Sequence, residues 1–111
     1  NMQLEKVDMP INQFVQLTTG KSLTVTRIVT TPISTTLYFE GLENDQSPDF
    51  VLYDAEGTVH TFSEKHTEDD GSGMVLYNGL SLVGEKFQLE IQQDGAAISD
   101  LYSFEAANTL K

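Results

Sequence analysis

The chain contains no cysteine and no tryptophan among its 111 residues. The lack of cysteine excludes disulfide bonds, zinc ribbons and thiol nucleophiles. It does not fix the compartment, because a domain of this length can be stable without a disulfide even in an oxidising environment. No apolar run approaches the roughly 20 residues that a membrane-spanning helix requires. We therefore expect no direct membrane insertion by this segment.

Basic residues are also scarce. Seventeen carboxylates outnumber six Lys and Arg residues, which gives a net charge of −11. Because nucleic acids would be repelled by this charge, nucleic-acid binding is not expected. The charge is uneven, since residues 40–70 hold ten carboxylates and a single lysine, Lys65. The sequence predicts one strongly negative side or end, which is either a solvated surface or a site for a cation or a basic partner.

Motifs of catalysis are missing as well. The sequence has no Gly-x-Ser-x-Gly, and Gly71-Ser72-Gly73 lies in an acidic turn without a histidine partner at a suggestive spacing. So many carboxylates lie in turns that no pair stands out as the acid and base of a hydrolase. We expect a non-enzymatic protein with no catalytic residues and no cofactor.

What the sequence does contain is the pattern of β-strands. Residues 22–31 and 34–40 are rich in Thr, Val, Ile and aromatic residues, and Pro32 between them marks a corner or an edge. Alternation is clearest over residues 86–92, where every second residue is apolar. In all, the sequence predicts seven or eight strands, at residues 14–18, 23–30, 36–40, 50–54, 58–63, 74–78, 86–92 and 101–105.

Turn-forming residues separate these strands at intervals of about 8–12 residues, which is typical of a two-sheet β-sandwich. Asp54-Ala-Glu-Gly57 is predicted to be a tight hairpin whose glycine adopts positive φ. We assign residues 13–111 to the sandwich and residues 1–12, which include Pro10, to an N-terminal linker or edge strand. The predicted core residues are Phe39, Leu52, Phe87, Leu89 and Ile91.

Two segments invite a metal-site interpretation, and neither supports it. His60, Glu64 and His66 would lie on the same face of one strand. Six positions of that strand, however, separate the two histidines by about 20 Å, which is too far for a shared metal ion. Residues 68–73 are rich in oxygen ligands but lack the Asp-x-Asp-x-Asp-Gly spacing, so a polar hairpin tip is expected there. Sequence alone does not bring Asp45 and Asp49 together into a cation site. The prediction is no metal site.

Three tyrosines support an alternative function. Tyr38, Tyr53 and Tyr77 alternate with apolar neighbours, so that some are expected to face outward and offer stacking surface to a sugar. The alternative is thus a carbohydrate-binding sandwich, with calcium in the acidic loops as an optional ligand. The lack of tryptophan weighs against it.

Residues 20–57 also resemble a known type of domain. The matching elements are a strand, Thr31-Pro32 and a second strand, followed by Leu52-Tyr53-Asp54-x-x-Gly57, with a weaker match at residues 86–92. This arrangement is similar to the C-terminal immunoglobulin-like domain of uncharacterised Gram-positive extracytoplasmic proteins, which are membrane-tethered and related to anti-sigma-factor-type proteins. The resemblance implies an extracellular, non-catalytic interaction or sensory module of a larger, membrane-anchored bacterial protein.

A module of this kind would bind another protein through a sheet face, its loops or an exposed strand edge. We expect the exposed edges near Pro32 or at the two chain ends.

Overall fold

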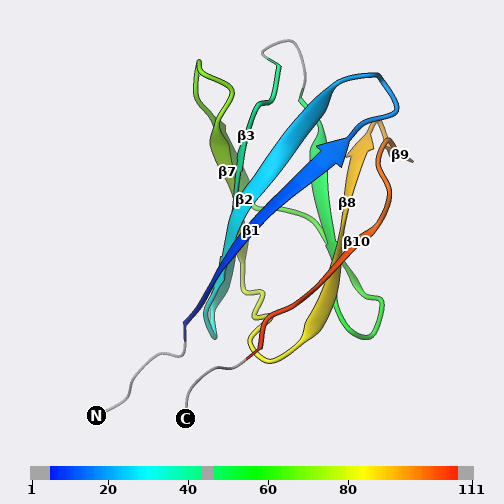
Figure 1. Ribbon diagram of the computed structural model, residues 1–111. Helices are drawn as coiled ribbons and strands as arrows, with labels where there is room; N and C mark the ends of the chain where they lie inside the picture. The colour runs from blue at the N-terminus through cyan, green and yellow to red at the C-terminus, as the bar shows by residue number, and fades with distance from the viewer. Residues whose placement is uncertain (1–5, 44–46, 108–111) are drawn as a thin grey trace.

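The computed structural model describes residues 6–43 and 47–107 and shows two antiparallel β-sheets (Figure 1). The strands are β1 (Val7–Gln16), β2 (Ser22–Thr30), β3 (Ser34–Glu40), β4 (Asp49–Tyr53), β5 (Val59–His60), β6 (Glu64–Thr67), β7 (Gly73–Asn78), β8 (Lys86–Gln93), β9 (Ala96–Ala97) and β10 (Tyr102–Glu105). One sheet has the order β1-β2-β3-β7-β6, and the other has the order β10-β8-β4-β5 with β9 paired to β8. The predicted all-β class is confirmed, and two strands without a predicted counterpart, β6 and β9, raise the count to ten.

The core lies between the two sheets and contains the predicted residues. Phe39, Leu52, Phe87, Leu89 and Ile91 are all buried. Near the centre, the ring of Phe39 from β3 stacks on that of Phe50 from β4, with 4.9 Å between centroids. Because β3 and β4 belong to different sheets, this pair joins the two layers directly. Aromatic pairs of this geometry stabilise a fold by about 0.5–1.5 kcal/mol beyond their area burial.

Two buried threonines of the first sheet form hydrogen bonds with the loop of residues 79–85, which connects β7 and β8. The N–H of Leu82 donates to Oγ1 of Thr30 at 2.8 Å, and the hydroxyl of Thr35 donates to the carbonyl of Leu80 at 2.9 Å. The two threonine oxygens are 2.9 Å apart. Since Thr35 has one hydroxyl proton and gives it to Leu80, Thr30 must be the donor between them. The N–H of Leu82 and the carbonyl of Leu80 are therefore both hydrogen-bonded inside the sandwich.

Pro32 lies in the turn between β2 and β3. The hydroxyl oxygen of Thr31 accepts hydrogen bonds from the N–H groups of Ile33 and Ser34, at 3.2 and 3.1 Å, and so closes this turn. Because β2 and β3 are both interior strands, Pro32 marks a corner. The expectation of an exposed edge near Pro32 is wrong.

The predicted strand at residues 58–63 is confirmed only in part. Its first part is β5, which pairs with β4, and the chain then crosses to the other sheet and continues as β6 beside β7. Val59 is 55% exposed, whereas Phe62 is half-buried against the core. Residues 58–63 therefore contain one short strand, β5, and the crossover that leads to β6.

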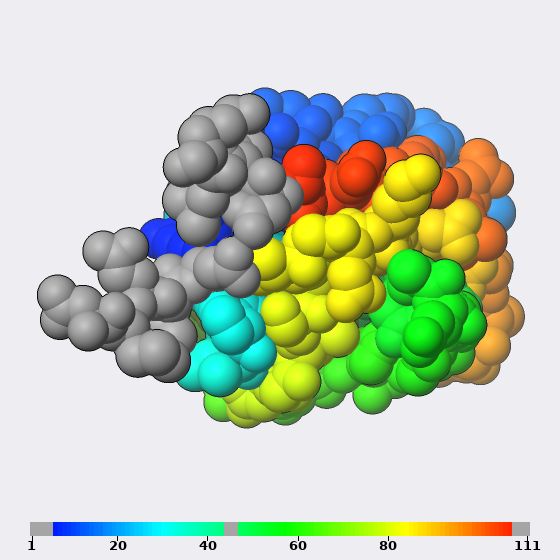
Figure 2. All heavy atoms as spheres, turned by 90° about the horizontal axis from the view of Figure 1, so that it is seen from below, coloured from blue at the N-terminus to red at the C-terminus, as the bar shows by residue number. Residues whose placement is uncertain are grey.

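Residues 7–12 form the first part of β1, an edge strand that pairs with β2. The pairing shifts between Pro10 and Gln13, where Asn12 has a φ of 50°. The strand predicted at residues 14–18 is thus the second part of a longer one. β1 begins and β10 ends at the lower end of Figure 1. Figure 2 shows this end from below, with the loop of residues 79–85 (yellow) between the β2–β3 turn (cyan) and the turn of residues 54–57 (green).

Candidate functional site

Four connections gather at the upper end of the molecule in Figure 1, and together they form what we call the loop end: residues 17–21, 41–43 with 47–48, 68–72 and 94–95. The N–H of Leu42 donates to the carbonyl of Gly71 at 2.9 Å. Lys21 forms an ion pair with Glu43 at 3.0 Å. These contacts fix three of the connections relative to one another.

The loop end carries most of the acidic cluster. Six of the ten carboxylates in residues 40–70 lie there or at the strand ends beside it: Glu40, Glu43, Asp49, Glu68, Asp69 and Asp70. Asp94 adds a seventh carboxylate from the β8–β9 turn. Asp54, Glu56 and Glu64 lie toward the opposite end, and Asp45 lies outside the described residues. The acidic run is therefore split between two ends, with the larger part at the loop end.

The turn of residues 68–72 is the polar hairpin tip that the sequence predicts. The N–H of Glu68 donates to the carbonyl of Ser72 at 2.7 Å. Oδ1 of Asp70 accepts hydrogen bonds from the hydroxyl and N–H of Ser72, at 2.6 and 3.0 Å, and these bonds lower the pKa of Asp70. Gly71 has a φ of 88°, and a Cβ there would lie 2.7 Å from the carbonyl oxygen of Leu42. Glycine therefore permits the close contact between the two loops.

His60 and His66 lie in different sheets, so the premise that they share one strand is wrong. His60 Nε2 lies 2.9 Å from Oδ2 of Asp54, and His66 Nε2 lies 3.0 Å from Oε2 of Glu68. Within residues 6–43 and 47–107, no three His, Asp or Glu side chains are grouped closely enough to hold a metal ion. Each histidine instead pairs with a single carboxylate.

The hairpin at residues 54–57 forms as predicted. Oδ1 of Asp54 accepts hydrogen bonds from the N–H groups of Glu56 and Thr58, at 2.9 and 3.0 Å. Gly57 donates its N–H to the carbonyl of Asp54 and has a φ of 83°. The hydrogen bond with His60, together with these backbone bonds, lowers the pKa of Asp54. The carboxylate thus holds the turn in place.

The three tyrosines do not form one surface. Tyr38 lies on the outer face of the first sheet, where the guanidinium of Arg27 stacks 4.9 Å from its ring centroid. Tyr53 lies on the second sheet and donates its hydroxyl to Oε1 of Glu90 at 3.0 Å. Tyr77 is buried and donates its hydroxyl to the carbonyl of Phe50 at 2.7 Å, and burial raises its pKa. An outward Tyr77 is therefore excluded, and the other two point away from each other on opposite layers.

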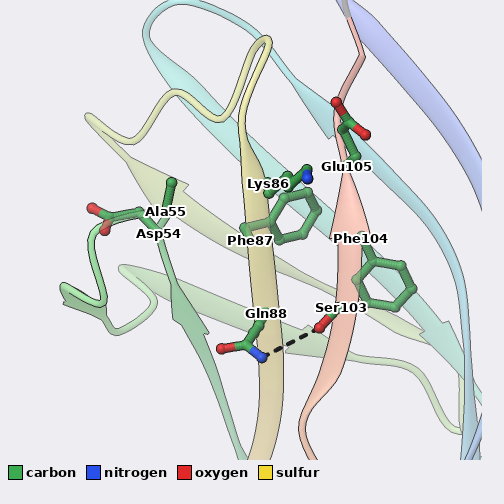
Figure 3. A pocket seen from close by; sticks show the side chains of 8 residues that line it. All are labelled: Asp54, Ala55, Lys86, Phe87, Gln88, Ser103, Phe104 and Glu105. Atoms are coloured by element: carbon green, nitrogen blue, oxygen red, sulfur yellow. Dashed lines mark hydrogen bonds between the residues drawn. The ribbon is translucent and has the colours of Figure 1, made fainter.

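A shallow cavity of about 510 Å³ lies on the second sheet (Figure 3). It is bounded by Asp54 and Ala55 on one side, residues 86–88 of β8 in the centre and residues 103–105 of β10 on the other side. Across it, Nε2 of Gln88 donates to the hydroxyl of Ser103 at 3.2 Å. The cavity forms where β4 ends at Tyr53 while β8 and β10 continue. Sequence analysis missed it because no local pattern shows that one strand stops before its neighbours.

Comparison with protein-family models, with curated proteins and with solved structures finds no match to this chain. In the part of the chain that the structure describes, no helix is long and apolar enough to cross a membrane.

Proposed function

We propose that this chain is an immunoglobulin-like domain that acts as a non-catalytic interaction or sensory module. In this proposal it belongs to a larger bacterial surface or membrane-anchored protein and works outside the cell. Its partner is another protein, which it binds through the loop end.

The strand order supports the immunoglobulin-like assignment. In the constant-type immunoglobulin fold, strands A, B, E and D form one sheet and strands C, F and G form the other. Here β2-β3-β7-β6 take the places of A-B-E-D, and β10-β8-β4 take those of G-F-C. β5 lies beside the C position, and β1 is an additional strand before A. The chain also departs from antibody domains, because it has neither the inter-sheet disulfide nor the tryptophan on strand C, and the stacked rings of Phe39 and Phe50 occupy the space between B and C.

The observation that carries the interaction role is the charge of the loop end. Binding residues are disproportionately found on loops that a rigid scaffold positions, and immunoglobulin-like sandwiches present such loops at their ends. The acidic side chains at this end come from separate connections, and Glu68, Asp69 and Asp94 are exposed. A surface of this kind attracts a basic protein and accelerates the encounter. The extracellular location and the membrane-anchored parent are supported by the resemblance of residues 20–57.

The positions of the three tyrosines give little support to the carbohydrate-binding alternative. A stacking platform needs aromatic rings on a common face. Tyr77 is in the core, Tyr38 is covered by Arg27 and Tyr53 is hydrogen-bonded to Glu90 on the other sheet.

A pair of charge-reversal variants tests the proposal. The double change Glu68→Lys/Asp69→Lys alters the loop end, and Glu56→Lys/Glu85→Lys alters the opposite end by the same net charge. All four side chains are exposed, so both variants are expected to fold. We expect the loop-end variant to lose binding to the protein's natural partner, and the control to retain it. Equal loss in both variants would show that only net charge matters, and loss in the control alone would place the interface elsewhere.

A further inference from the structure

In the described part of the two sheets, five strands pair on one side only, and four of them are protected against pairing with another chain. β1 contains Pro10 and an irregular pairing at residues 10–13. All four residues of β6 are polar or charged, and β5 and β9 have only two residues each. Prolines, bulges, charges and short length are the features with which proteins block edges. β10 is as short as β6, but it has no proline, pairs with β8 without a shift and carries one charged residue, Glu105.

The backbone of β10 presents free groups to one side. The N–H of Ala106 donates to the carbonyl of Glu85 at 2.9 Å, which continues the ladder between β10 and β8. Adjacent residues of a strand direct their backbone groups to opposite sides, so Tyr102 and Phe104 bond to β8. Ser103 and Glu105 therefore direct their N–H and C=O groups away from β8. No backbone hydrogen bond joins β10 to β1 within the described residues.

An apolar groove lies directly beside this edge. β1 runs next to the end of β10 in Figures 1 and 2, and a cavity of about 370 Å³ separates them. Its lining includes Met9 and Ile11 from β1 and Phe104 from β10, which are half-buried side chains packed against the core. A strand added to β10 would point every second side chain into this groove, because successive side chains of a strand face opposite ways.

The side chains on the outer face of β10 favour a basic partner segment. On β10, the side chains of Ser103 and Glu105 point away from the core, and Glu105 lies opposite Lys86 of β8. A basic residue of an added strand would lie beside Glu105 and complete a row of alternating charge. Cross-strand pairs of opposite charge contribute about 0.2–1 kcal/mol each. The net charge of −11 favours a basic segment in the same sense and disfavours a second copy of this chain.

We propose that β10 is a docking edge for an extended, basic segment of a partner protein, which adds to the second sheet as a further strand. Its apolar side chains enter the groove between β1 and β10, and its basic side chains lie beside Glu105. The inference rests on the proposed function only in that the partner is a polypeptide. It concerns a different surface from the loop end.

The test uses a synthetic hexapeptide that alternates lysine and valine, with a peptide of the same composition in block order as the control. We expect the alternating peptide to shift the amide resonances of Ser103 and Glu105 of the isotope-labelled domain. These two amides should be slowed in hydrogen exchange by about tenfold at saturation, while those of Tyr102 and Phe104, already bonded to β8, change little.

Two variants at one position provide the matched comparison. Ser103→Pro removes the outward N–H, together with the hydroxyl that accepts from Gln88, and we expect it to weaken binding about tenfold or more. Ser103→Ala keeps that N–H and should bind the peptide as the unchanged domain does. Glu105→Gln should weaken binding several-fold. If Ser103→Pro fails to fold, the exchange pattern of the unchanged domain still decides the question.

Several results would overturn the proposal. These are equal binding of the block-order peptide, equal binding by the Ser103→Pro and Ser103→Ala variants, and tighter binding of the corresponding glutamate–valine peptide. Exchange protection of Ser103 in a dimer without peptide would assign the edge to a second copy instead. None of these results bears on the charge-reversal experiment at the loop end, so the two proposals fail separately.

Discussion

The substitution Thr35→Val tests the buried hydroxyl pair. Valine has nearly the shape of threonine but no hydroxyl, so the core remains filled while two hydrogen bonds are lost. The carbonyl of Leu80 loses its donor, and the hydroxyl of Thr30 loses its acceptor. A buried polar group left unsatisfied costs about 1–3 kcal/mol. With two such groups and some relaxation of the loop, we expect the free energy of unfolding to fall by about 2–4 kcal/mol.

The neighbouring substitution Thr36→Val provides the control. Thr36 lies on the outer face of the sheet, opposite Leu76 of β7, and valine suits an exposed strand position. Urea denaturation should therefore show a change within about 0.5 kcal/mol for Thr36→Val. In thermal melts, Thr35→Val should lower the melting temperature by about 4 °C per kcal/mol lost. Similar stabilities of the two variants would refute both the assigned register and the hydroxyl network.

Three further predictions concern the core, acid and salt. Phe87→Ala should cost about 3–5 kcal/mol in chemical denaturation because its ring is buried, and Gln88→Ala on the opposite face should be nearly silent; equal effects would show that the register of β8 is wrong. Because folding lowers the pKa of Asp54, the stabilisation by its carboxylate is complete above pH about 4 and is lost as pH falls through the folded-state pKa. Asp54→Asn should therefore reduce the fall in melting temperature between pH 6 and pH 2. An unchanged dependence of the melting temperature on pH would contradict this prediction. Sodium chloride should raise the melting temperature by screening, and calcium at matched ionic strength should add little; a calcium-specific rise abolished by Asp69→Asn would contradict the prediction of no metal site.

The parts of the fold that sequence analysis predicted are those with local causes. Residues 86–92 alternate strictly, so both their conformation and their buried face follow from the pattern. The turn at residues 54–57 follows from a carboxylate and a glycine that bond within the same four residues.

The parts that it missed depend on distant contacts. Residues 74–77 are all apolar, so their sequence does not show which face is buried. The structure buries Val75 and Tyr77, and the hydroxyl of Tyr77 reaches the carbonyl of Phe50 across the sandwich. Leu76 faces outward instead.

The candidate sites are non-local in the same way. Composition showed that residues 40–70 are acidic, but only the sheet order separates the carboxylates of the loop end from Asp54, Glu56 and Glu64. The free edge of β10 depends on the absence of a neighbouring strand in the described part of the sheet, which no pattern within residues 101–105 reveals.

Site-specific photo-crosslinking tests the central claim, that this domain binds a protein through its loop end, most directly. A photoreactive amino acid is placed at Asp69 of the loop end or, as the control, at Glu85 of the opposite end, both of which are exposed. The protein is then irradiated in the cells that make it. We predict a discrete protein adduct from position 69 and none from position 85. An adduct from position 85 alone, or glycan rather than protein attached at position 69, would contradict the account.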